Sequence, residues 1–311
     1  MPSEIVRAIQ KVGYDTPSPI QMASIPIGLL KRDVIGVAET GSGKTCAFVV
    51  PMLAYIMELP RMTDEVATKG PYALVMAPTR ELAKQIFGEL RKVAEHHTLT
   101  AALLTGGKDV AMERRVMAQT NIIIATPGRL LQHMDESPEF DTGGVKILVL
   151  DEADRCLDMG FSNALTAILQ NLPKSRQTLL FSATMDKRVI DAGKQTMRQG
   201  FQVIDTVGEE VSTADAVAQS AMVVPLDSLN AALVAAVQRA RSVPSHKIIV
   251  FFTTARQTRW SSELFAAMGM PVHEIHSRKS QTARERVSKQ FKNETNTVMF
   301  SSDVSARGMD Y

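Results

Sequence analysis

The segment DVIGVAETGSGKT, residues 33–45, carries the strongest structural signal in this chain. Its first six residues have the apolar character of a buried strand, and the apolar helical pattern FVVPMLAYIMELP follows soon after. Between them, AETGSGKT resembles the phosphate-binding P-loop, G-x-x-x-x-G-K-[ST]. Ala38 replaces the first glycine of that pattern, whereas Gly43, Lys44 and Thr45 match it. The order strand, glycine-rich turn and helix therefore predicts a site for nucleotide phosphates.

The residue types of this loop fit phosphate chemistry. Glycines allow backbone N–H groups to turn toward phosphate oxygens, and the N-terminus of the following helix adds its positive dipole. In a P-loop, Lys44 would reach the β- and γ-phosphates and Thr45 would hold Mg²⁺. We therefore expect the nucleotide to contact the whole loop: Ala38, Glu39, Thr40, Gly41, Ser42, Gly43, Lys44 and Thr45.

Short β-rich runs recur on the C-terminal side of this loop, each closed by small or turn residues and most of them followed by a helical pattern. They comprise residues 72–77, 100–105, 121–126, 146–150, 177–182 and 201–205. This alternation predicts an α/β fold with a doubly wound parallel sheet and helices on both faces. In such sheets, ligands bind beyond the carboxyl ends of the strands.

A second alternation of the same kind follows a stretch without apolar periodicity. It consists of a helix from Asp227 to about Arg241 and of four strands, at residues 220–224, 247–252, 272–276 and 297–301. We expect one domain over 1–207, a linker over 208–218 and a second domain over 219–311. The last strand has no helix after it, so the second sheet is expected to be incomplete.

Composition narrows the class of protein but does not name a partner. The 311 residues are 45% hydrophobic and 22% charged, and their net charge of +2 is too small to argue for nucleic acid by itself. Cys46 and Cys156 lie far apart in the sequence, which indicates neither a disulfide framework nor a zinc site. No apolar run approaches the length of a membrane span. We expect a reducing intracellular location and no membrane association.

The segment ILVLDEAD, residues 147–154, places carboxylates at the end of another buried strand. Alone, it could instead be an acidic helix start, where Asp and Glu are favoured. Together with a P-loop, it predicts that Asp151 lies at the Mg²⁺ ion and that Glu152 activates the attacking water. Lys44, Asp151 and Glu152 are thus the expected catalytic residues. Guanine-specific relatives usually carry Asn-Lys-x-Asp, which this chain lacks, so adenine is the expected base.

The segment GYDTPSPIQ, residues 13–21, precedes the P-loop. The amide of Gln21 could pair with an adenine edge, and Tyr14 offers an aromatic face. As an isolated peptide it would be read as a proline-rich turn between helices. Its place before the P-loop favours the nucleotide interpretation.

These segments, in this order, resemble the DEAD-box RNA helicase family. The resemblance covers nearly the whole chain and also includes PTRELA (78–83), GG (106–107), TPGR (126–129), SAT (182–184), QTAR (281–284) and SSDVSARGMD (301–310). It implies two RecA-like domains, ATP and Mg²⁺ as cofactors, and a single-stranded or short duplex RNA partner bound without sequence preference. The expected activity is RNA-stimulated ATP hydrolysis coupled to local unwinding.

The resemblance also implies roles for further residues. The expected RNA contacts are Thr79, Arg80, Gly106, Gly107, Thr126, Gly128, Arg129, Gln281, Arg284 and Ser302. Hydroxyl and guanidinium donors suit phosphate oxygens, and glycines permit close approach. Asp154, Ser182 and Thr184 are expected to couple the two ligands, and Asp310 to hold the ATP ribose. Taken singly, each fragment is an ordinary capped helix start or turn.

The sequence leaves three points open: whether the chain is a fragment, whether it unwinds or clamps RNA, and in which compartment it works. The family's Arg-rich element, of the form HRxGRxGR, does not occur in this chain, so we expect a fragment of a longer protein that hydrolyses ATP poorly. Losing such an arginine costs about 10³ to 10⁵ in turnover. The alternative to an unwinder or RNA chaperone is an ATP-dependent RNA clamp with little turnover. A weak likeness to the organellar branch, in IHSRKSQ and the last residues, makes a mitochondrion or plastid an option.

Overall fold

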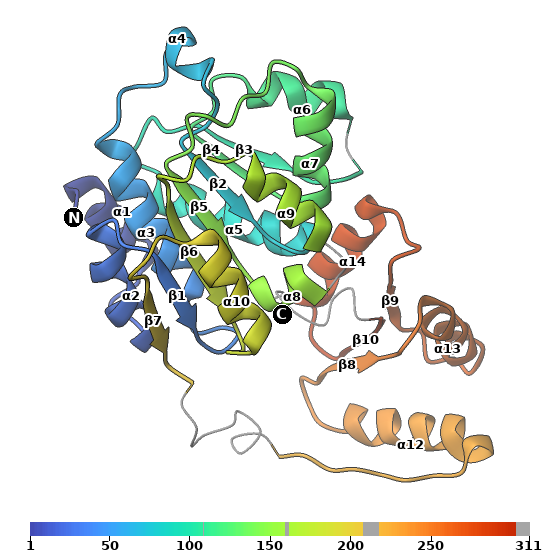
Figure 1. Ribbon diagram of the computed structural model, residues 1–311. Helices are drawn as coiled ribbons and strands as arrows, with labels where there is room; N and C mark the ends of the chain where they lie inside the picture. Colours follow the sequence, from blue (N-terminus) through green and yellow to red (C-terminus); the bar gives the residue numbers. More distant parts are fainter. Residues whose placement is uncertain (108, 159–161, 208–217, 303–311) are drawn as a thin grey trace. The chain divides into compact units, whose positions relative to one another are not determined.

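The computed structural model describes the chain except for residues 108, 159–161, 208–217 and 303–311 (Figure 1). The contacts divide the chain into two compact units, Met1–Thr213 and Ala214–Tyr311. This division falls inside the segment predicted as a linker, of which residues 208–217 lie outside the described residues. The predicted α/β class with parallel sheets is confirmed in both units.

The first unit is built on a seven-stranded sheet in the order β3-β4-β2-β5-β6-β1-β7, and every pair of neighbours is parallel. All seven strands lie within the segments predicted from the sequence. They are β1 (Val34–Val37), β2 (Ala73–Met76), β3 (Ala101–Leu104), β4 (Ile122–Ala125), β5 (Ile147–Leu150), β6 (Gln177–Ser182) and β7 (Gln202–Asp205). The inner strands read as continuous apolar runs because both of their faces are covered.

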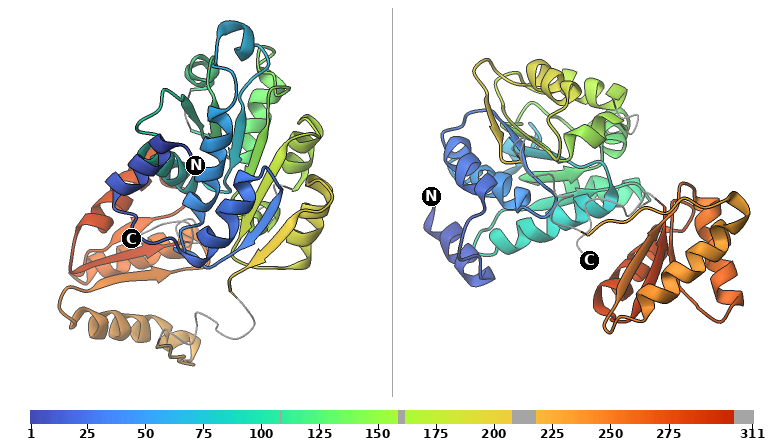
Figure 2. Two further views of the ribbon diagram at one scale, coloured as in Figure 1. Left: turned by 90° about the vertical axis from the view of Figure 1, so that its left-hand side faces the viewer. Right: turned by 90° about the horizontal axis from the view of Figure 1, so that it is seen from below.

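Helices cover both faces of this sheet (Figures 1 and 2). Side chains alternate along each strand, so Val75 of β2 belongs to one apolar core and its neighbour Leu74 to the other. The first core is packed by α1 (Ser3–Val12), α2 (Pro19–Leu29), α3 (Lys44–Met57), α4 (Asp64–Ala67) and α5 (Arg80–Val93). The second core is packed by α6 (Val110–Met117), α7 (Pro127–Glu136), α8 (Ala153–Asp158), α9 (Ser162–Gln170) and α10 (Lys187–Thr196).

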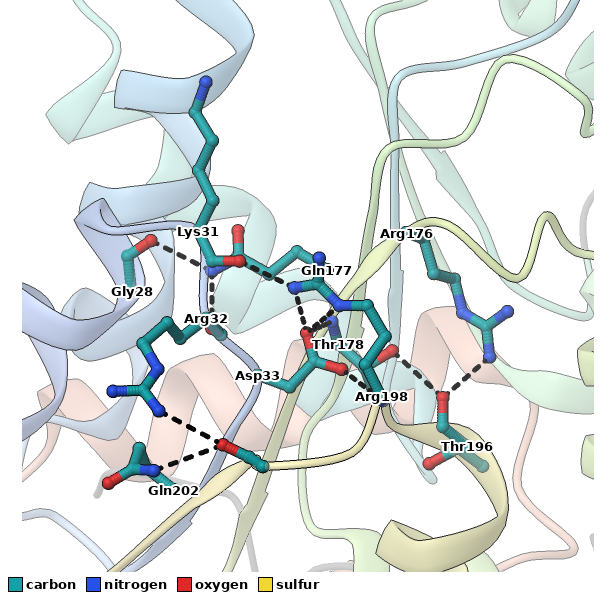
Figure 3. A network of polar contacts seen from close by, with 11 residues as sticks. Gly28, Lys31, Arg32, Asp33, Arg176, Gln177, Thr178, Thr196, Arg198 and Gln202 are labelled. Carbon is teal, nitrogen blue, oxygen red and sulfur yellow. Dashed lines mark hydrogen bonds and ion pairs between the residues drawn. The ribbon is translucent and has the colours of Figure 1, made fainter.

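A network of polar contacts holds the amino ends of β1 and β6 (Figure 3). The buried carboxylate of Asp33 accepts hydrogen bonds from Thr178 N at 3.1 Å, Arg198 N at 2.8 Å and Arg198 Nε at 3.1 Å. The side-chain amide of Gln177 donates to Arg32 O at 2.8 Å. These bonds fix the amino ends of the two strands. The P-loop begins at the opposite, carboxyl end of β1.

The second unit has a three-stranded parallel sheet in the order β8-β10-β9. Its elements are η1 (Leu226–Ser228), α12 (Leu229–Arg241), β8 (Lys247–Phe251), α13 (Ala255–Ala267), β9 (His273–Ile275), α14 (Gln281–Asn293) and β10 (Thr297–Ser301). Val237, Phe265 and Phe300 form the core on one face, and Phe291 packs on the other. The predicted helix from Asp227 and three of the four predicted strands are confirmed.

The prediction of a strand at residues 220–224, the first of the four along this unit, is wrong. The segment has no regular structure, Val223 is 99% exposed, and within the described residues no strand pairs with it. A β-rich segment without a neighbouring strand leaves its backbone groups to water, so propensity alone does not make it a strand.

Among the helices that the structure describes, none has the length and apolar character needed to cross a membrane.

Candidate functional site

The predicted site residues of the first unit gather beyond the carboxyl ends of the strands, and the strand order sorts them into two groups. The P-loop follows β1, residues 151–154 follow β5 and residues 182–184 end β6, and these three strands are neighbours. We call their ends the nucleotide half. The segments starting at Thr79, Gly106 and Thr126 follow β2, β3 and β4, which are also neighbours, and we call their ends the RNA half.

The P-loop has the backbone that its glycines predict. Gly41 and Gly43 have φ of 83° and 84°, in the left-handed region that side-chain-bearing residues avoid. α3 begins directly after Gly43, with Lys44 and Thr45 in its first turn. Lys44 Nζ donates to Ala38 O at 2.5 Å and to Glu39 O at 3.0 Å. The lysine side chain thus folds back over the loop. Phosphate oxygens of a bound nucleotide would take the place of these two carbonyls as hydrogen-bond acceptors for Nζ.

Gln21 connects α2 to the P-loop. Its Oε1 accepts from Ser18 N at 3.1 Å, which caps α2, and its Nε2 donates to Gly43 O at 3.0 Å. A Cβ atom on Gly43 would lie 2.4 Å from Gln21 Nε2 and would displace this amide, and the φ of 84° at Gly43 also favours glycine. The pairing of Gln21 with adenine stays a prediction, and the structure gives its amide a second task that the sequence did not reveal.

Tyr14 lies before α2 and is 41% exposed. Its hydroxyl donates to Glu89 Oε2 of α5 at 2.8 Å, and burial, followed by that carboxylate, raises the pKa of the phenol. Tyr14 is thus only partly exposed, and its stacking on the adenine base stays a prediction.

The acidic pair at the end of β5 is buried and electrostatically coupled to the P-loop. Asp151 and Glu152 are 3% and 8% exposed, and Asp151 Oδ1 accepts from Glu152 N at 3.0 Å. Burial and the charge of Glu152 raise the pKa of Asp151 to about 7, while Lys44 opposes that rise. Burial lowers the pKa of Lys44, against the attraction of both carboxylates. The structure therefore brings all three predicted catalytic residues together.

The donor set fits a magnesium-bound nucleotide. Within the described residues, Ser42 Oγ and Asp154 Oδ1 are buried without a hydrogen-bond partner, and a nucleotide with its ion would offer them one. Among the residues that the structure describes, no group of three or more His, Cys, Asp or Glu side chains could hold a metal ion by itself. Mg²⁺ in nucleotide enzymes takes one or two protein carboxylates and fills its shell with water and phosphate oxygens, so such a cluster is not required. Thr45 and Asp151 remain the predicted ligands.

The end of β6 touches both the acidic segment and the P-loop strand. Thr184 Oγ1 donates to Asp154 Oδ2 at 3.4 Å, and Thr184 N donates to Ser182 Oγ at 3.2 Å. Ser182 O accepts from Ala38 N at 3.1 Å. These residues therefore lie where a change at the nucleotide could be transmitted, and their coupling role stays a prediction.

In the RNA half, two predicted segments touch each other. Thr79 Oγ1 accepts from Leu82 N at 3.2 Å and so caps α5, whose first residue is Arg80. A Cβ atom on Gly106 would lie 2.8 Å from Arg80 Nη2, so the guanidinium covers this glycine. Gly107 has a φ of 92°. The Arg80 guanidinium and the backbone of Gly106 are therefore adjacent.

The third segment of this half differs from the simple expectation of exposed donors. Gly128 is exposed at the start of α7, whereas Thr126 and Arg129 are buried, at 9% and 8% exposure. Arg129 Nε donates to Glu113 Oε2 at 2.6 Å. Sequence reasoning missed Glu113, because no pattern marks one carboxylate on a short charged helix as buried.

The second unit places its predicted RNA residues at the carboxyl end of its sheet. Gln281 and Arg284 lie in the first turn of α14, where Ser280 Oγ accepts from Ala283 N at 3.3 Å. Ser302 follows β10 and is 2% exposed, and its backbone N–H donates to Ile275 O at 3.2 Å. Asp310 lies outside the described residues.

Comparison with known proteins decides the family. The family model described as DEAD/DEAH box helicase matches residues 18–192, more than half of the chain. The chain belongs to this family. A second model, Helicase conserved C-terminal domain, matches residues 228–311. The family predicted from the ordered motifs is confirmed.

Curated relatives of this helicase chain include ATP-dependent RNA helicase DBP4 of Mycosarcoma maydis, 41% identical over 98% of this chain and 33% of the relative. DEAD-box ATP-dependent RNA helicase 26 of Oryza sativa subsp. japonica is also 41% identical, over 98% of this chain and 57% of the relative. The chain thus spans about a third to three fifths of the length of these relatives.

Solved helicase structures share the fold. Mss116p bound to single-stranded RNA and AMP-PNP superposes with a TM-score of 0.88 at 29% identity, covering 100% of this chain and 65% of that one. Dbp5 of S. cerevisiae bound to RNA and ADP BeF3 gives 0.80 at 26% identity, covering 100% of this chain and 76% of that one. The predicted RecA-like architecture is therefore confirmed.

The raised pKa of Asp151 predicts an unusual effect of the substitution Asp151→Asn on helicase stability. With a folded-state pKa of about 7 and an ordinary value of 3.8, the folded protein binds the extra proton between these limits. The contribution of Asp151 to the free energy of unfolding therefore falls as pH rises from about 4 to 7. Above pH 7 the full cost of burying its charged carboxylate is present. Asparagine removes that cost, which is roughly 4 kcal/mol for a pKa raised from 3.8 to about 7. We therefore expect a Tm gain of about 8–16 °C at pH 8 and little change at pH 4.

Thermal unfolding of wild type and Asp151→Asn in metal-free buffer with EDTA, from pH 4 to pH 8, measures this difference. Asp191→Asn, at an exposed carboxylate of α10, is the matched control and should show no pH-dependent gain. A Tm difference that stays constant over this pH range would show that Asp151 is charged throughout.

Proposed function

We propose that this chain is the core of an ATP-dependent RNA helicase that binds single-stranded RNA through its backbone. The observation that carries the proposal is the sorting of motifs by strand order. Nucleotide residues follow β1, β5 and β6, and RNA residues follow β2, β3 and β4, at one edge of one rigid sheet. The names of the relatives, and the RNA in the related solved structures, support the same assignment.

In the nucleotide half, ATP would bind with Mg²⁺, which supplies charge neutralisation between the phosphates. The backbone N–H groups of the P-loop and Lys44 would bind the phosphate oxygens, while Thr45 and Asp151 would hold the ion. Glu152 lies beside Asp151 and orients the attacking water. Gln21 senses the state of the loop, because its amide already bonds Gly43 O.

In the RNA half, the donors are of the kind that bind phosphate and sugar rather than base edges. Arg80 and the backbone of Gly106 and Gly107 offer one contact surface, and the exposed Gly128 lies at the amino end of α7. Such contacts position a strand without reading its sequence. We expect nucleotide and RNA to bind cooperatively, because each ligand would favour the same conformation of the chain.

Fluorescence anisotropy with labelled oligo(U) and oligo(A) RNA, in Mg²⁺ and AMP-PNP, tests this proposal. We expect affinity to fall by roughly tenfold or more between 50 and 200 mM salt, since phosphate contacts release counterions. The two sequences should differ by less than about threefold, because backbone contacts do not read bases. Strong preference for one sequence, or no salt dependence, would contradict the proposal.

Local unwinding is the finer part of the proposal, and a clamp with little turnover is its alternative. Displacement of a labelled strand from a short RNA duplex, measured with ATP and with AMP-PNP, separates them. An unwinder releases strands repeatedly only with ATP, whereas a clamp shows slow RNA dissociation and no repeated release.

A further inference from the structure

One buried carboxylate joins two segments of the RNA half. Glu113, on α6, is 4% exposed. Its Oε1 accepts from Thr105 N at 3.2 Å, directly before the Gly106–Gly107 pair. Its Oε2 accepts from Arg129 Nε at 2.6 Å, in the first turn of α7. The same side chain therefore contacts the loop after β3 and the helix after β4.

A buried histidine extends the network along α7. His133 is fully buried, and its Nε2 lies 2.8 Å from Glu113 Oε2. Its Nδ1 lies 3.4 Å from Ser137 Oγ, which also accepts from Arg114 Nε of α6 at 2.9 Å. Two successive turns of α7 are thus tied to α6, and the two helices lie side by side in Figure 1.

The chemistry of this network fixes geometry. A buried carboxylate is costly to desolvate, so its hydrogen bonds must be kept, and losing one partner leaves an uncompensated charge. Glu113 accepts from a backbone N–H at Oε1 and from a guanidinium and an imidazole at Oε2. Such a carboxylate allows little change in the distance between the loop at Thr105 and the amino end of α7.

We propose that Glu113 is a positioning residue that sets the spacing between the Gly106–Gly107 loop and the TPGR segment, and thereby the affinity for RNA. The inference rests on the proposed function, since these two segments are its predicted phosphate contacts. Arg129 then acts from a buried position: bonded to Glu113, it holds the amino end of α7, where the exposed Gly128 would face a phosphate. Glu113 itself need not touch RNA.

The first unit contains a matched control. Asp33 is also a buried carboxylate, 3% exposed, that accepts backbone and guanidinium hydrogen bonds, but at the amino ends of the strands (Figure 3). A general effect of removing a buried charge should appear at both sites. A positioning effect on RNA should appear only at Glu113.

The experiment compares wild type, Glu113→Gln and Asp33→Asn as the full 311-residue chain, at a temperature well below each Tm. Anisotropy with labelled oligo(U) in Mg²⁺ and AMP-PNP gives the RNA Kd, and a fluorescent ATP analogue gives the nucleotide Kd. Glutamine keeps an acceptor for Thr105 N but loses the charge that holds Arg129. We expect a loss of about tenfold in RNA affinity, the effect of weakening one or two charge-assisted hydrogen bonds, with nucleotide affinity unchanged within about twofold.

A double-mutant cycle measures the coupling between Glu113 and Arg129 in RNA affinity, which a separate loss of stability in each variant would not produce. If Glu113 acts through Arg129, Glu113→Gln should cost little further RNA affinity in an Arg129→Gln background. Equal RNA affinity of Glu113→Gln and wild type would overturn the proposal, as would a parallel loss of nucleotide affinity, an RNA loss of the same size in Asp33→Asn, or additive effects in the cycle. Failure of the wild type itself to bind RNA would instead overturn the proposed function, and the positioning role with it.

Discussion

The substitution Lys44→Ala is expected to lower the affinity for Mg²⁺–ATP by roughly 10- to 100-fold, the range for losing charge-assisted hydrogen bonds to phosphate. Lys44 lies in the first turn of α3, and its Nζ already bonds Ala38 O and Glu39 O in the loop. The ammonium is therefore preplaced for phosphate oxygens. Removing it also takes away a positive charge that lowers the pKa of Asp151, so this carboxyl group becomes harder to ionise.

Titration of a fluorescent ATP analogue against wild type and variant measures this loss. Lys31→Ala is the matched control, because Lys31 is an exposed lysine of the same unit, paired with Glu58 and remote from the predicted site residues. It should bind nucleotide like the wild type. Unchanged nucleotide affinity in Lys44→Ala would show that phosphate does not bind at this loop.

The fold was largely predictable because buried parallel strands have a simple signature. Each inner strand of the first unit is a short apolar run with small or polar residues after it, and the helices between the strands force the parallel direction. Residues 220–224 show the limit of that signature. They have the composition of a strand, but strand formation depends on a neighbour, which composition does not encode.

The site was predictable as a set of residues but not as an arrangement. The motifs identified Lys44, Asp151 and Arg129, yet the order β3-β4-β2-β5-β6-β1-β7 is what separates nucleotide from RNA residues. The partners of these residues were also hidden. Glu113 and His133 lie 20 positions apart and meet only because α6 packs beside α7. Long-range polar pairs of this kind leave no periodic pattern in a sequence.

The substitution Glu152→Gln is expected to slow ATP hydrolysis by about 10² to 10⁴, the usual contribution of a general base, while ATP affinity stays within about threefold of the wild type. Glu152 follows Asp151 at the end of β5, is 8% exposed, and has a φ of 48°, which is uncommon for a residue with a side chain. Such a conformation is kept only where the surrounding structure holds it. Here it places Glu152 beside the predicted metal ligand, where glutamine can still accept a hydrogen bond from water but cannot take its proton.

Single-turnover hydrolysis with enzyme in excess, with and without RNA, measures this effect even where turnover is slow. Glu58→Gln, at an exposed carboxylate, is the control and should hydrolyse ATP at the wild-type rate. Comparison with Asp151→Asn separates the two carboxylates. Asp151→Asn should lose the dependence of nucleotide affinity on Mg²⁺, whereas Glu152→Gln should keep it and lose only the chemical step. If both variants lost Mg²⁺ dependence alike, the two carboxylates would share the ion, and the water would need another base.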